Sequence, residues 1–149
     1  MFKNPYSVLV IIHNEINEVL LLERAQNARG FWQSVTGSLE KNETILQCAK
    51  REVFEETGFA APLNQLKCWR QTNRFRIFEC FQQRYAPGVI ENTEYVLSLN
   101  IAQKTPIVLN PKEHLAFQWL PWNQAGKMVF SPSNRNAIMY LGNYLLPFV

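Results

Sequence analysis

Hydrophobic and polar positions divide the first part of the chain into short strand-like runs and one longer helical stretch. Residues 6–24 contain two apolar runs, YSVLVIIH and EVLLLER, on either side of the polar NEINE, which predicts two strands joined by a short turn. The segment FWQSVTG predicts a short strand that ends at Gly37. Residues 43–57 contain neither Pro nor Gly and are followed by Gly58, which predicts a helix with a glycine stop.

The second half of the chain continues the strand pattern and ends in a helix. Residues 67–83 mix aromatic residues with arginines and predict one or two strands, while TEYVLSLNI and HLAFQWL predict further strands. Ser133 is expected to cap a helix that runs through Tyr144. Its buried stripe is expected to contain Ala137, Ile138, Leu141 and Leu145. This order of elements predicts an α+β fold, with a mixed β-sheet covered on both faces.

Composition narrows the class of protein. A chain of 149 residues with 47% hydrophobic content predicts one domain over residues 1–149. The net charge of +3 suits an anionic small molecule at least as well as nucleic acid or a membrane, and neither of these is expected as a partner. Three scattered cysteines do not predict a zinc site, and they are typical of a reduced, cytoplasmic protein. The apolar run at residues 6–12 is shorter than a signal-peptide core, so no targeting segment is expected.

The predicted helix of residues 43–57 carries an unusual concentration of acidic side chains. Glu52, Glu55 and Glu56 are spaced i, i+3, i+4 and therefore share one face. Most charged helix faces are simply solvated, but Cys48 and Ala49 lie on the same arc one turn earlier, so these carboxylates continue the buried face. Three like charges there repel one another unless a cation neutralises them. Oxygen ligands favour Mg²⁺, with Mn²⁺ as a substitute, and this points to phosphate chemistry.

The same stretch carries a recognisable motif. Gly37, five residues, Glu43, seven residues and then REVFEETGF (residues 51–59) resembles the Nudix box at each of its defining positions. The resemblance implies the Nudix fold, an α/β/α sandwich with a mixed β-sheet and a central metal-binding helix. It also implies roles for the motif residues: structural for Arg51, paired with Glu43, and for Gly58, and metal-binding for Glu52, Glu55, Glu56 and the carbonyl of Gly37.

Segments outside the box resemble one bacterial Nudix subfamily. They are FWQSVTGS, RYAPGV followed by NTE, EHLAFQWL and SNRNAI. The resemblance implies metal-dependent hydrolysis of dihydroneopterin triphosphate to its monophosphate and pyrophosphate, with dATP and other deoxynucleoside triphosphates as further substrates. Two alternatives stay open. One is a general nucleotide-sanitising or dinucleoside polyphosphate hydrolase, and the other is a non-catalytic, nucleotide-sensing Nudix domain, which the intact carboxylates disfavour.

Such a hydrolase needs a base for the attacking water and groups that hold the substrate. The candidate bases are Glu52 and Glu113, and Glu113 is also a candidate metal ligand; His114 is more typical of a structural histidine. The predicted substrate contacts are Arg24, Trp32, Gln33, Ser38, Arg74 and Arg135. Strand alternation places Arg74 opposite Phe75, so a solvated sheet face is its alternative, and Lys3 lies in no such pattern. The phosphorus attacked, the metal count and the oligomeric state stay open.

Overall fold

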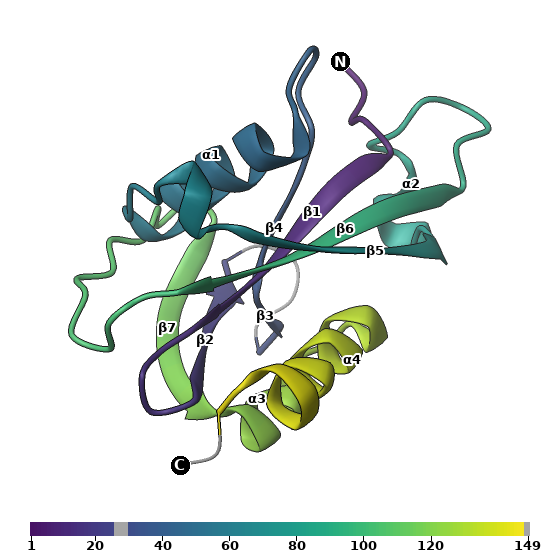
Figure 1. The fold of residues 1–149 in the computed structure, drawn as a ribbon. Coiled ribbons are helices and arrows are strands. Elements are labelled where there is room, and N and C mark those ends of the chain that lie inside the picture. The colour runs from purple at the N-terminus through teal and green to yellow at the C-terminus, as the bar shows by residue number, and fades with distance from the viewer. Residues whose placement is uncertain (26–29, 148–149) are drawn as a thin grey trace.

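The computed structural model describes residues 1–25 and 30–147 (Figure 1). The strands are β1 (Tyr6–His13), β2 (Glu18–Arg24), β3 (Trp32–Gln33), β4 (Val35–Ser38), β5 (Lys67–Arg76), β6 (Glu91–Asn100) and β7 (His114–Pro121). The helices are α1 (Ile45–Thr57), α2 (Glu79–Gln82), α3 (Trp122–Met128) and α4 (Pro132–Tyr140), with a 3-10 turn at Leu63–Gln65 and a π-helical turn at Leu141–Leu145. Among the described residues, no helix is long and apolar enough to span a membrane.

The strands form one mixed sheet that divides beside β1. Its main path runs β3-β2-β1-β6-β5, with β4 added to β1 and β7 added to β2. β1 and β6 are parallel along the whole of β1, and the other pairs are antiparallel. β1 and β2 pair only at His13 and Val19, after which β4 takes the place beside β1 and β3 the place beside β2. The sheet therefore opens between these two pairs of strands.

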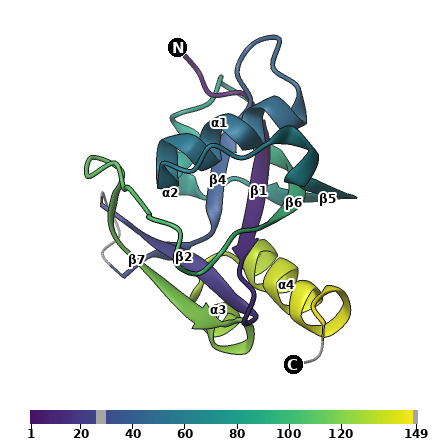
Figure 2. The ribbon, with the colours of Figure 1, turned by 60° about the vertical axis from the view of Figure 1, so that its left-hand side comes forward.

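Helices cover both faces of the sheet, as Figures 1 and 2 show. On one face, Cys48, Ala49 and Val53 of α1 pack against alternate residues of β1, such as Val8 and Val10. On the other face, α3 and α4 pack against the intervening β1 residues, which include Leu9 and Ile11. The six central residues of β1 are therefore all buried, as a continuous apolar run with helices on both sides predicts. The expected α+β class and the helix-covered mixed sheet are confirmed.

Several predicted elements differ in detail. α1 begins at Ile45 instead of residue 43, because Thr44 caps it in a reciprocal capping box with Gln47, and it ends as predicted at Gly58, whose φ is 77°. Part of the region expected to be strand, residues 79–82, forms α2, and α3 was not predicted.

The C-terminal helix also differs from the prediction. Ser131, not Ser133, is its cap, because Pro132 occupies the first helical position and the Ser131 hydroxyl accepts from the Asn134 amide. The predicted buried position of Leu145 is wrong. This side chain is 47% exposed, because a π-helical turn replaces the regular α-helical period after Tyr140.

Candidate active site

α1 presents its acidic residues with graded exposure. The side chain of Glu56 is only 3% exposed, that of Glu52 is 13% exposed and that of Glu55 is 46% exposed. Glu52 and Glu56 therefore do continue the face that Cys48 and Ala49 bury, whereas Glu55 lies at its rim. Because burial destabilises a charged carboxylate, this arrangement requires compensating partners.

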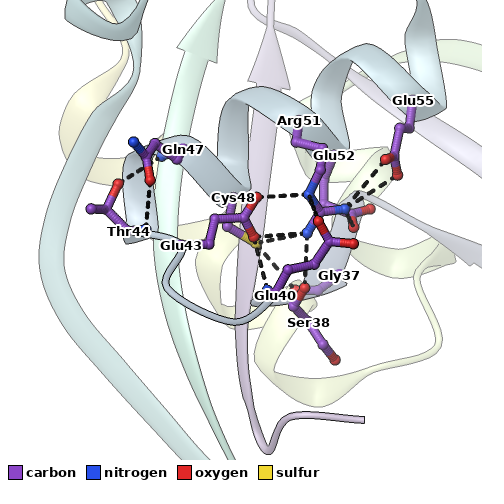
Figure 3. A network of polar contacts seen from close by, with 10 residues as sticks. All are labelled: Gly37, Ser38, Glu40, Glu43, Thr44, Gln47, Cys48, Arg51, Glu52 and Glu55. Atoms are coloured by element: carbon purple, nitrogen blue, oxygen red, sulfur yellow. Dashed lines mark hydrogen bonds and ion pairs between the residues drawn. The ribbon is translucent and has the colours of Figure 1, made fainter. Parts of the chain in front are cut away.

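Arg51 supplies this compensation for Glu52 and Glu55 (Figure 3). Its Nε and Nη2 donate to the two oxygens of Glu43 at 2.7 and 2.9 Å, the pairing that the motif implies. Nη1 donates to Glu52 Oε1 at 2.6 Å and makes longer contacts of 3.3 and 3.4 Å with Glu55. Nη2 also donates to the Ser38 carbonyl at 3.0 Å, which ties α1 to the end of β4. The guanidinium holds the pKa of Glu43 at about 2, mainly through their hydrogen bonds.

Gly37 lies directly beneath Glu52. A Cβ placed on Gly37 would fall on the carboxylate carbon and both oxygens of Glu52. The φ angle of Gly37 is not positive, so close approach is the reason for glycine here, and not a special backbone conformation. Only glycine lets the helix bring Glu52 this close to strand β4.

Glu56 is the most perturbed carboxyl group of the site. Burial raises its pKa well above the usual value, and the neighbouring Glu52 raises it further. Its Oε1 lacks a hydrogen-bond partner among the described residues, and His114 Nε2 lies 3.7 Å away, too far for a hydrogen bond. Burial and the nearby Arg24 lower the pKa of His114 to about 4, so the imidazole is neutral at pH 7 and forms no ion pair with Glu56.

The donor set fits a hard divalent cation. Glu52, Glu55 and Glu56 offer carboxylate oxygens on one helix, and Gly37 offers a backbone carbonyl beside them. In residues 1–25 and 30–147, no three acidic, histidine or cysteine side chains already converge as a closed metal site. The reason is visible in Figure 3, where Glu52 and Glu55 turn towards Arg51. The unpartnered Oε1 of buried Glu56 is the strongest sign that a cation belongs here.

A cavity of about 1090 Å³ adjoins this carboxylate face. The basic side chains that line it include Lys3, Arg24 and Arg84. They are close enough that Arg84 and Arg24 lower the pKa of Lys3, after the larger effect of burial. The guanidinium of Arg24 lies over the rings of Phe31 and Phe81, 5.6 and 5.4 Å from their centroids, which fixes its position. Mutually repelling, partly buried cations in a cavity favour a polyanionic ligand.

Only some of the site residues predicted from the sequence line this cavity. Its lining includes Gly37, Glu52, Glu56, Arg24, Gln33, Ser38, Glu113 and His114. Trp32, Arg74, Arg135 and Glu55 are not part of that lining. Trp32 packs instead against the α3–α4 core, and Arg74 and Arg135 are exposed. Phe75, on the opposite side of β5 from Arg74, does line the cavity. Sequence reasoning missed Lys3, Asn92, Glu94, Phe78 and Phe81, and the only signal for Asn92 and Glu94 was the alternation of NTE within a strand.

Comparison with known proteins identifies the class. The NUDIX domain family model matches residues 3–141, and the chain belongs to the Nudix family of hydrolases, which depend on a divalent metal. Among curated relatives, dihydroneopterin triphosphate diphosphatase of Escherichia coli K12 is 43% identical over 142 residues, covering 93% of this chain and 92% of that protein. The Haemophilus influenzae protein of the same name is 36% identical, covering 95% of this chain and 90% of that protein.

Solved structures agree with this placement. The E. coli dihydroneopterin triphosphate pyrophosphohydrolase superimposes with a TM-score of 0.85 at 42% identity, covering 93% of this chain and 94% of that chain. A C. elegans Ap4A hydrolase reaches a TM-score of 0.67 at 18% identity, covering 93% of this chain and 97% of that one, which supports the fold alone. The Nudix fold expected from the sequence is therefore confirmed.

Proposed function

We propose that this Nudix hydrolase converts dihydroneopterin triphosphate to dihydroneopterin monophosphate and pyrophosphate, with Mg²⁺ as its metal and Mn²⁺ as a substitute. The observation that carries the proposal is one cavity in which the acidic face of α1 meets the cations Lys3, Arg24 and Arg84. A triphosphate needs both, because its charge is neutralised by metal and by basic side chains together. The identity of 43% to enzymes named for this substrate favours the pterin compound over other triphosphates.

Residues of α1 would hold the metal, together with the carbonyl of Gly37. Glu52, Glu55 and Glu56 are the proposed ligands, and Arg51 positions Glu52 through the 2.6 Å hydrogen bond. When bound there, Mg²⁺ would neutralise the phosphoryl oxygens and increase the acidity of a bound water. Lys3, Arg24 and Arg84 would bind the phosphate chain and keep it extended along the cavity, which restricts the reacting phosphorus to one position.

Glu113 is the proposed base for the attacking water. It lines the cavity, and its carbonyl accepts from the Ala25 amide at 2.8 Å, which holds the loop before β7 against the end of β2. Glu52 is the less suitable base, because its Oε1 already accepts from Arg51. Gln33 and Ser38 are proposed polar contacts to the substrate, since both line the cavity.

The test is pyrophosphate release by the purified protein with Mg²⁺, using dihydroneopterin triphosphate, dATP, GTP and a dinucleoside polyphosphate. The proposal expects the highest kcat/KM with the pterin and no release in EDTA. Preference for a nucleotide would refute the substrate assignment but not the hydrolase chemistry. Absence of release from every compound would refute both and favour a sensing role.

Matched arginine variants test the phosphate contacts. Arg84→Met should raise KM about 10-fold or more, because it removes a charged partner of the phosphates. Arg74→Met should leave KM unchanged, because Arg74 is exposed and outside the cavity lining. Equal effects of the two substitutions would contradict the proposed phosphate path.

A further inference from the structure

The cavity has a second polar wall, formed by strand β6 away from the acidic helix. Asn92 and Glu94 line the cavity and are only 3% and 5% exposed. They alternate with Thr93, and Val96 continues their face into the core beneath α3 and α4. The wall therefore belongs to the opposite face of the sheet from Gly37 and Glu52.

Not every hydrogen-bond acceptor of this wall has a donor among the described residues. The Asn92 amide donates to the Ser7 hydroxyl at 2.7 Å, while its Oδ1 is buried without a partner among the described residues. Glu94 Oε1 accepts from the Asn73 amide at a long 3.4 Å, and the Ser133 hydroxyl also interacts with this carboxylate. Burial raises the pKa of Glu94, as expected of a carboxyl group that lies away from water. A buried acceptor such as Asn92 Oδ1 is costly to leave unpaired, so a ligand with hydrogen-bond donors fits this wall.

Flat apolar side chains surround the same wall. Phe75 is the cross-strand partner of Asn92, and Phe78, which precedes α2, and Phe81 of α2 also line the cavity. The rings of Phe78 and Phe130 pack in an edge-to-face arrangement with centroids 5.4 Å apart. Aromatic surfaces beside buried acceptors suit a planar heterocycle. Its face would stack on the aromatic rings, and the N–H groups at its edge would donate hydrogen bonds to the acceptors.

We propose that Asn92 and Glu94 form the ring-recognition site, and that they select a heterocycle with a ring N–H beside an exocyclic amino group. The 2-amino-4-oxopyrimidine edge of a pterin or a guanine has this pattern. The Glu94 carboxylate accepts from the ring N–H and one amino hydrogen, and Asn92 Oδ1 accepts from the other. Adenine presents a ring nitrogen lone pair beside its amino group, so it meets the carboxylate with one donor and one repulsive acceptor. This inference rests on the proposed triphosphate hydrolysis, which places the phosphates at α1.

The Glu94→Gln substitution should change kcat/KM differently for the pterin substrate and for dATP. A glutamine of the same shape presents one acceptor and one donor, which mismatches the two donors of the pterin but matches adenine. We expect kcat/KM for dihydroneopterin triphosphate to fall roughly 10- to 100-fold, mainly through KM, as for loss of a bidentate contact. For dATP, kcat/KM should stay constant or rise. Glu91→Gln is the matched control, because Glu91 is exposed on the same strand and should leave the preference unchanged.

A binding measurement separates this proposal from the catalytic one. Quenching of tryptophan fluorescence by dihydroneopterin triphosphate in EDTA reports affinity without turnover, and Glu94→Gln should raise Kd at least 10-fold. If the wild type releases no pyrophosphate but this rise is seen, hydrolysis is refuted and ring recognition is supported. Hydrolysis by the wild type with an unchanged pterin-to-dATP ratio in Glu94→Gln would overturn ring recognition alone.

A second variant guards against a folding defect. Asn92→Leu removes the unpartnered acceptor with little change in volume and should also lower the pterin-to-dATP ratio in a protein whose melting curve shows cooperative unfolding. Proportional losses for both substrates in Asn92→Leu and Glu94→Gln would assign these residues a structural role and overturn the proposal.

Discussion

Substitution of Gly37 by alanine isolates the close approach between β4 and α1. The added methyl group would fall on the Glu52 carboxylate, which is the mobile end of a side chain and can rotate away. Rotation off its favoured geometry costs about 0.5–1.5 kcal/mol. Loss of its contact with Arg51 costs about 0.5–1 kcal/mol. Because the backbone at Gly37 suits any residue, alanine recovers about 0.4–1 kcal/mol by restricting the unfolded chain.

These contributions leave a net destabilisation of roughly 0–2 kcal/mol, equivalent to a fall in Tm of less than about 8 °C for a chain of this size. The effect on function should be far larger. If Glu52 is the metal ligand proposed above, displacing its carboxylate by about 1 Å or more should lower kcat/KM at least 100-fold, since catalysis requires close positioning. The assays are pyrophosphate release, Mn²⁺ titration and thermal unfolding of the same preparations.

Gly88→Ala is the matched control. Its φ of 88° strains any other residue, but an added Cβ would meet nothing within 4 Å. It should cost about 1 kcal/mol of stability and leave kcat/KM unchanged, the reverse of the pattern at Gly37. Wild-type turnover and Mn²⁺ affinity in Gly37→Ala would refute the argument that Glu52 must occupy this position.

Three further substitutions test other parts of the molecule. In Arg51→Lys, the lysine cannot bridge Glu43 and Glu52 as the guanidinium does. Urea unfolding should show that the free energy of unfolding falls by about 2 kcal/mol, and activity should fall as well. Unchanged stability would contradict the bridging role. Glu56→Gln mimics the neutral acid that burial favours, so turnover should disappear while the melting curve stays close to wild type, and retained activity would exclude this carboxylate from the mechanism. Burial lowers the pKa of His13 to about 4. As the pH is lowered, the unfolded chain therefore takes up a proton near pH 6.5, before the folded protein does. The free energy of unfolding should fall as the pH decreases from about 6.5 to about 4. His13→Gln should flatten the pH dependence of the unfolding free energy in that window; an unchanged slope would show that His13 does not contribute.

Local patterns predicted the acidic helix and the face that it buries. Helical periodicity placed Glu52 and Glu56 on the face buried by Cys48 and Ala49, because residues three and four apart in a helix are neighbours wherever the helix lies. The Arg51–Glu43 pair, in contrast, was expected only from the resemblance to the Nudix box, and the structure confirms it.

The substrate-facing part of the cavity depended on tertiary structure. Alternation along β5 separated Arg74 from Phe75, but it could not tell which face would meet the cavity, and Phe75 does. From sequence, Trp32 was an equally plausible ring contact, but in the structure its side chain packs against the core beneath α3 and α4. Lys3, Arg24 and Arg84 are distant in sequence, as are Ser7 and Asn92, and the parallel pairing of β1 with β6 is what brings the latter two within a hydrogen bond. Periodicity describes the surroundings of a residue within its own helix or strand, whereas such contacts depend on which strands pair and in which register.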